Sequence, residues 1–118
     1  MCDKEIDMEN KFLILSERSR LEILEFLPTA KDLRKMAGFF HNFADDTRLK
    51  ILACLSISDM CVNDLAKVLN LNQTTASHQL GLLRNAGLIT FRRVGKVLIY
   101  SLQKKAVNDI MLTAVQCL

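Results

Sequence analysis

Residues 73–79 concentrate side chains that donate and accept hydrogen bonds but carry no fixed charge. On a helix at about 100° per residue, most of these polar positions share one side with Gly81 and Asn85, and the apolar positions share the other. An ordinary solvated helix face usually carries Glu and Lys, whereas this one has no charge before Arg84. Small hydroxyl and amide groups fit the edges of bases in the major groove of DNA. The residues predicted to make such contacts are Gln73, Thr74, Thr75, Ser77, His78 and Gln79.

The elements around these residues predict a helix-turn-helix. A short helix over about 62–69 is followed by the turn 70–72 and a second helix over about 73–86. Asn70 tolerates the left-handed conformation that ends a helix, and Asn72 is a favourable N-cap for the next one. In this layout the second helix enters the major groove.

The run 88–102 is rich in β-branched and aromatic residues and has Gly95 near its middle, which predicts a β-hairpin. Its basic residues lie near the predicted tip, where a wing reaches phosphates or the adjacent minor groove. The alternative is a plain edge hairpin whose charges prevent aggregation. The predicted phosphate and wing contacts are Lys67, Arg84, Arg92, Arg93 and Lys96.

The charge distribution supports a polyanionic partner. The chain has 118 residues and a net charge of +3. Residues 1–64 hold 9 Lys or Arg against 12 Asp or Glu, whereas residues 65–108 hold 7 Lys or Arg and no acid. The basic half coincides with the predicted helix-turn-helix and hairpin, which favours nucleic acid as the partner.

The remaining chain is predicted to be helical, over about 10–27, 29–43, from 45 or 46 onward, and 104–117. The fold class is therefore mainly α (α+β): a winged helix-turn-helix with a two-stranded β-hairpin wing and flanking dimerisation helices. Residues 1–28 form an N-terminal extension, and residues 29–118 form the DNA-binding and dimerisation domain. The last helix has a wide apolar face, which either docks on the domain's own core or forms a dimer seam.

No stretch of about 18 apolar residues is present, which argues against a transmembrane helix. Four acids among the first ten residues argue against a signal peptide, so a cytoplasmic location and free thiols are expected. Enzymatic activity is not expected, because the basic half lacks paired carboxylates, a Ser-His-Asp arrangement and a phosphate-loop glycine spacing.

Four segments in order resemble the ArsR/SmtB family of bacterial metal-responsive repressors. They are residues 45–52, 60–66, 73–80 and 83–88, and the resemblance covers about residues 30–117. It implies a homodimeric winged-helix repressor whose interface uses a helix before the core and the last helix. It also implies a palindromic operator, with DNA affinity lowered by an inducer or by thiol oxidation.

The resemblance also implies where an inducer acts. The family's thiolate-type sensors carry Cys-Val-Cys-Asp-Leu where this chain has Cys61 and, in place of the second cysteine, Asn63. A soft metal ion or arsenite needs two to four thiolates, so Cys2 would have to complete a site with Cys61. The family's carboxylate and histidine zinc site is expected to be absent, since the last helix has Asp109 but no His.

Other family members sense oxidants or reactive sulfur through two cysteines, one on the helix after the Asp-x-Thr-Arg-Leu motif and one on the last helix. Cys54 and Cys117 occupy those elements and are the redox-sensor candidates. The alternatives are that Cys54 is a small buried hydrophobe, or that the chain senses nothing through its cysteines. A winged-helix protein-interaction module without sequence-specific DNA binding remains the alternative function.

Overall fold

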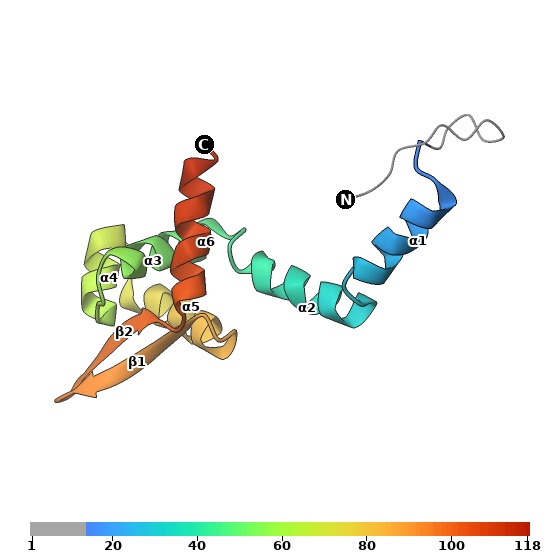
Figure 1. Ribbon diagram of the computed structural model, residues 1–118. Helices are drawn as coiled ribbons and strands as arrows, with labels where there is room; N and C mark the ends of the chain where they lie inside the picture. The colour runs from blue at the N-terminus through green and yellow to red at the C-terminus, as the bar shows by residue number, and fades with distance from the viewer. Residues whose placement is uncertain (1–13) are drawn as a thin grey trace. The chain divides into compact units, whose positions relative to one another are not determined.

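Six helices and one antiparallel hairpin make up residues 14–118, the part of the chain that this computed structural model describes (Figure 1). This architecture confirms the predicted fold class. The elements are α1 (Glu17–Phe26), α2 (Ala30–His41), α3 (Asp46–Ile57), α4 (Val62–Leu69), α5 (Gln73–Asn85), β1 (Ile89–Val94), β2 (Val97–Leu102) and α6 (Lys105–Gln116).

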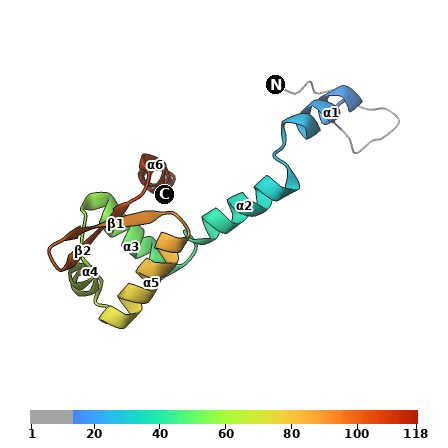
Figure 2. The same cartoon turned by 90° about the horizontal axis from the view of Figure 1, so that it is seen from below.

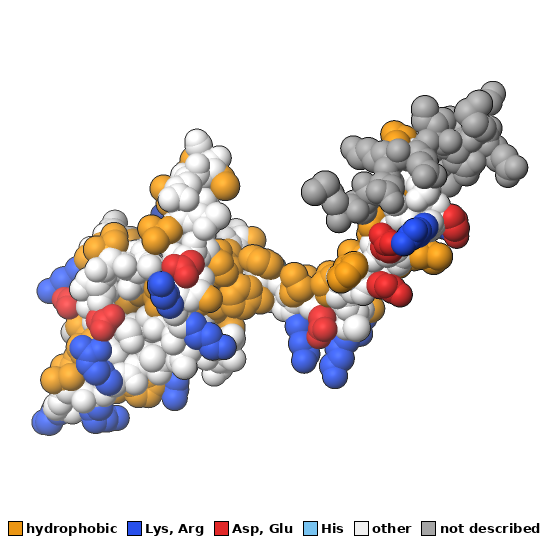
Figure 3. All heavy atoms as spheres, in the orientation of Figure 1, with side chains coloured by type: hydrophobic (Ala, Val, Ile, Leu, Met, Phe, Trp, Pro, Cys, Tyr) orange, Lys and Arg blue, Asp and Glu red, His pale blue; other side chains and the backbone are white. Residues whose placement is uncertain are grey.

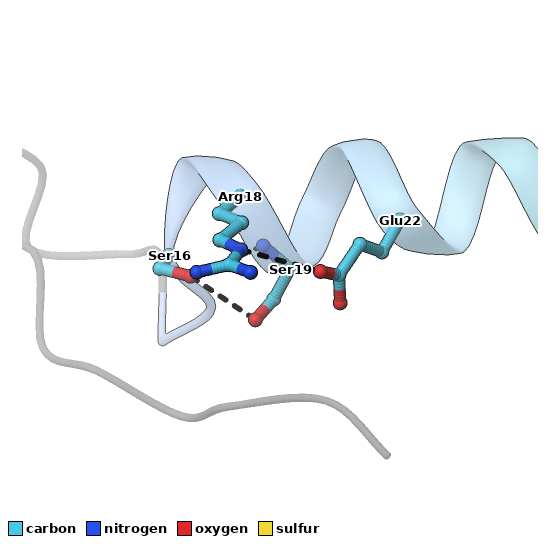
Figure 4. Close-up of polar contacts among 4 residues, drawn as sticks. All are labelled: Ser16, Arg18, Ser19 and Glu22. Atoms are coloured by element: carbon cyan, nitrogen blue, oxygen red, sulfur yellow. Dashed lines mark hydrogen bonds and ion pairs between the residues drawn. The ribbon is translucent and has the colours of Figure 1, made fainter.

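The chain divides into two units, Met1–Met36 and Ala37–Leu118. In the first unit, the prediction that a helix spans residues 14–16 is wrong, because Ser16 caps the start of α1 instead. The Ser16 hydroxyl oxygen accepts the backbone N–H of Ser19 at 3.1 Å and donates to the Ser19 hydroxyl at 3.0 Å (Figure 4). Arg18 and Glu22 form an ion pair one turn apart, at 3.4 Å. The predicted helical residues 10–13 lie outside the described residues.

In the second unit, α3 is the central helix, packing against α4, α5, α6 and β2 (Figures 1 and 2). Its residues Ile51 and Leu52 are fully buried. The other members of the core are Cys54 and Leu55 of α3 and, from the rest of the unit, Leu65, Leu80, Leu83, Leu88, Ile89, Val107 and Met111. One face of α6 therefore docks on the domain's own core. This is one of the two explanations offered above for the wide apolar face of the last helix.

The turns form for the local reasons that the sequence predicted. Asp45 accepts the backbone N–H of Arg48 at 2.9 Å and caps α3. Asn70 ends α4 in the left-handed region, at φ 54° and ψ 47°. Asn72 then accepts the N–H of Thr75 at 2.7 Å and caps α5. These caps fix the short connection between α4 and α5, and with it the helix-turn-helix.

The hairpin joins β1 to β2 through Gly95 and Lys96, with Val94 paired to Val97. Gly95 has φ +64°, a conformation that a glycine adopts without steric cost. At the other edge of β2, Tyr100 exchanges two backbone hydrogen bonds with Met60, of 2.8 and 3.1 Å. The connection between α3 and α4 is therefore tied directly to the hairpin.

Candidate nucleic-acid interface

The two faces of α5 divide as the sequence predicted. Ala76, Leu80 and Leu83 have no exposed surface and face the core. On the opposite side, the residues exposed to solvent are Thr74, Ser77, His78, Gly81 and Asn85. This face contains no acidic side chain, and its ionisable groups are the imidazole of His78 and the guanidinium of Arg84, which lies two turns after Ser77 on the same side of the helix. It presents hydrogen-bonding groups to a partner without charge repulsion.

Other predicted contact residues on α5 are engaged within the protein. The Gln73 side-chain amide N–H donates to Oδ1 of Asn63 on α4. Thr75 and Gln79 are half-buried. The side-chain oxygen Oε1 of Gln79 accepts a hydrogen bond from Nε of Arg48 on α3 at 3.0 Å. No residue pattern predicted these bonds, although Arg48 belongs to the motif that carried the family resemblance.

A stack of side chains joins α5 to the hairpin. The Arg84 guanidinium lies 4.2 Å from the centroid of the Phe91 ring, and Phe91 lies 5.7 Å from the ring of Tyr100. Arg84 is exposed and carries its charge at this junction. Such cation–π and aromatic contacts stabilise the angle between the two elements.

The adjacent arginines of β1 differ in their surroundings. Successive strand residues point to opposite faces, so Arg93 shares the face of Phe91, whereas Arg92 lies on the other. Arg92 donates to the Asp59 carboxylate at 2.9 Å. Within residues 14–118, no ion pair involves Arg93 or Lys96. The hairpin therefore offers two free cations and one that is already paired.

Exposed basic side chains without an ion pair among the described residues also occur outside the hairpin. Lys67 on α4 and Arg84 on α5 are exposed and make no ion pair with any described residue. Lys and Arg side chains gather around the hairpin in the space-filling view (Figure 3). The structure thus places the basic residues on elements adjoining the exposed face of α5. Among residues 14–118, none of the helices combines the length and the apolar composition that a membrane span requires.

Cys61 lies just before α4, beside a cleft of about 340 Å³ that Ser77, Lys96 and Tyr100 also line. A soft metal needs further thiolates, and no group of three or more His, Cys, Asp or Glu side chains occurs among residues 14–118. The described residues around Cys61 therefore do not fit a metal ion. Cys2, the other candidate ligand, lies outside the described residues.

The two redox-sensor candidates have different environments. Cys54 is a buried free thiol on α3, and Cys117 is an exposed free thiol that ends α6. Burial raises the pKa of the Cys54 thiol, which lowers its thiolate fraction at neutral pH. Cys54 thus has the environment of a small core residue, while Cys117 is open to solvent.

This difference predicts the order of thiol reactivity. With iodoacetamide at pH 7, Cys54 should be alkylated about ten-fold or more slowly than Cys117, because its thiolate is both scarcer and less accessible. Timed quenching and peptide mass spectrometry measure both rates in one sample. Raising the pH should speed the alkylation of Cys54. Its raised pKa leaves it largely protonated at pH 7, so its thiolate fraction still increases at higher pH. Equal rates at pH 7 would contradict this assignment.

A second surface feature lies away from α5. An apolar groove of about 640 Å³ runs between the end of α2, α3 and α6. Asp46 and Lys50 form an ion pair of 3.1 Å at its edge. Its apolar lining residues are Phe40, Phe43, Leu49, Ala53, Ile110, Met111, Ala114, Val115 and Leu118.

Comparison with known proteins identifies a matching family and several relatives of this chain. The family described as bacterial regulatory protein, arsR family, matches residues 45–90. A cadmium resistance transcriptional regulatory protein CadC homolog from Staphylococcus aureus is 39% identical over 87 residues, covering 69% of this chain and 72% of that protein. The transcriptional repressor SmtB homolog from Synechocystis is 38% identical over 77 residues, 65% of this chain. This chain spans 58% of the length of the Synechocystis protein.

A solved structure resembles the fold over most of the chain. It is the homodimeric winged helix-turn-helix DNA-binding domain Mb0332 from Mycobacterium bovis. The TM-score is 0.66 at 25% sequence identity, with 86% of this chain and 85% of that chain covered.

Proposed function

Because the chain belongs to the ArsR family of bacterial regulatory proteins, we propose that it is a homodimeric transcriptional repressor that binds a palindromic DNA operator and is released by an inducer. The observation that carries the proposal is the exposed, acid-free face of α5 beside a basic hairpin. In this arrangement Ser77 and His78 read base edges, and the hairpin cations contact phosphates.

Homodimerisation is supported by the apolar groove between α2, α3 and α6. Phe40, Leu49 and Val115 line this groove and are 50%, 38% and 65% exposed, which is unusual for one small domain. A second copy would cover these side chains and place two α5 helices on one duplex. A palindromic operator matches such a two-fold dimer, because each half-site meets the same protein surface.

Release through thiols completes the proposal. It is supported by the unpaired Cys54, Cys61 and Cys117 and by the cadmium-resistance relative. Reactive sulfur or an oxidant would act through Cys54 and Cys117, and a soft metal through Cys61 and Cys2. Operator affinity measured with cadmium, arsenite, polysulfide and peroxide on single Cys→Ser variants separates these inducer classes.

The salt dependence of DNA affinity tests the proposed function directly. An operator is first selected from random duplexes, and the logarithm of its affinity is plotted against that of salt concentration. Arg93→Ala and Lys96→Ala should each flatten the slope by about 2 and weaken binding to all sequences, because each removes one phosphate contact in both half-sites of the proposed dimer. Arg92→Ala is the matched control, and should change the slope less because Asp59 already pairs with Arg92.

Two results would count against the proposal. Selection of no preferred sequence would favour a winged-helix protein-interaction module. A preferred sequence with slopes unchanged in both hairpin variants would remove the hairpin from the DNA interface.

A further inference from the structure

The side chain of Arg48 connects three helices. Its Nε donates to Oε1 of Gln79 on α5 at 3.0 Å, and its Nη1 donates to Oδ1 of Asn42 at 3.4 Å. Asn42 follows α2 and donates its own amide to the carbonyl oxygens of Gly38 and Phe39, at 3.2 and 3.3 Å. Arg48 is therefore anchored at the end of α2 while it holds a side chain of α5.

The hydrogen bond from Arg48 determines which atoms of the Gln79 amide remain free to bind a partner. A glutamine amide carries an acceptor oxygen and an NH₂ group with two donors, whereas a guanidinium carries donors only. Arg48 therefore bonds to the oxygen and occupies one of its two lone pairs, whereas both donors of the Gln79 NH₂ group are left for an outside partner. Pairing with adenine would need both the oxygen and the NH₂ group in one plane, and is therefore disfavoured here.

The position of Gln79 on α5 favours a backbone contact for the same group. Gln79 lies about 60° around the helix from buried Ala76 and about 100° from exposed His78. It is half-buried, so it sits at the flank of the exposed face. When such a helix lies in a major groove, its flanks meet the phosphates that border the groove. A phosphate oxygen is an acceptor and so complements the NH₂ group of Gln79.

We propose that Arg48 is a positioning residue for DNA binding, which holds the Gln79 oxygen so that the Gln79 NH₂ group donates to a backbone phosphate. This assignment rests on the proposed function. It places Gln79 among the residues that orient the protein on DNA and removes it from those that read sequence.

A methylphosphonate scan of the selected operator tests the proposal. Each duplex carries one neutral methylphosphonate in place of one phosphate of a half-site, and its affinity is compared with that of the unmodified duplex. For the wild-type protein, affinity should fall about ten-fold at the phosphate that Gln79 binds, since hydrogen bonds to charged groups are strong.

The variants identify that phosphate. Gln79→Ala should make one position of the scan insensitive, to within about two-fold, and leave the others as in wild type. Arg48→Met keeps the aliphatic stem but removes the donors, and should make the same position insensitive. The double variant should match Gln79→Ala, because the two residues act as one unit. Arg34→Met removes an exposed cation elsewhere and should leave the scan unchanged.

The outcomes separate this proposal from the one on which it rests. Absence of any sequence-preferring DNA binding by wild type would overturn the proposed function, and this inference with it. Specific wild-type binding with an unaltered scan in Gln79→Ala or Arg48→Met would overturn this inference alone. So would a Gln79→Ala variant that loses discrimination at a base pair while keeping every phosphate sensitivity. Thermal unfolding of each variant establishes that it is folded.

Discussion

Replacing Gly81 with glutamate is expected to weaken operator binding about a hundred-fold while the domain stays folded. Gly81 lies in the middle of α5 on its exposed face, and a Cβ added there meets no atom within 4 Å. Removing a glycine from a helix interior favours the helix by up to about 1 kcal/mol. The free energy of unfolding should therefore stay level or rise slightly.

The expected loss of DNA affinity has two physical causes. The absence of a side chain at Gly81 lets the backbone of α5 approach the floor of the groove, and glutamate fills that space. Its carboxylate also lies against the negative potential of the DNA. A loss of about 1.4 kcal/mol in each of two half-sites corresponds to about a hundred-fold lower affinity.

Two variants at the same position separate these causes. Gly81→Gln has nearly the size of glutamate without its charge, so the difference between the two variants measures the repulsion. Gly81→Ala adds one methyl group and should change affinity much less than either. Operator binding by Gly81→Glu at wild-type affinity would show that this face of α5 does not approach DNA.

Replacing Val115 with aspartate is expected to convert the proposed dimer to a folded monomer. Val115 lines the apolar groove and is 65% exposed in the single chain, so a carboxylate there is solvated in the monomer. In the dimer the same carboxylate would be buried without a partner, which costs several kcal/mol. Operator affinity should fall about a hundred-fold or more, because each monomer then holds a single half-site.

Sedimentation velocity and DNA titration measure the two effects in the same sample. Thr113→Asp is the matched control, since Thr113 lies in the same last turn of α6 but does not line the groove. It introduces the same charge at the same end of the helix dipole and should remain a dimer. A dimeric Val115→Asp variant would place the interface on another surface.

Local signals were sufficient for most of the fold. Asn70, Asn72 and Asp45 each form the cap or turn that their side chains favour, because capping involves atoms only three or four residues apart. The alternation of buried and exposed residues along α5 likewise follows from helical periodicity alone. The start of α1 was misplaced because Ser16 caps it inside an otherwise apolar periodic run.

Contacts distant in sequence were not accessible in this way. Arg92 and Arg93 are neighbours in the chain, and both were predicted to contact DNA. Their different surroundings depend on Asp59, 33 residues before Arg92. The bond between Arg48 and Gln79 spans 31 residues, and neither residue type indicates its partner.

The sequence by itself determined the helix-turn-helix, the hairpin and the acid-free basic half, because these depend on residue type and short-range periodicity. Only the tertiary structure decided which of the polar and basic side chains remain free for DNA. It engaged Gln79 and Arg92 within the protein, left Ser77, His78, Arg93 and Lys96 exposed, and buried Cys54. The physical reason is that a side chain's availability depends on which groups packing brings within hydrogen-bond distance, and packing joins residues far apart in the chain.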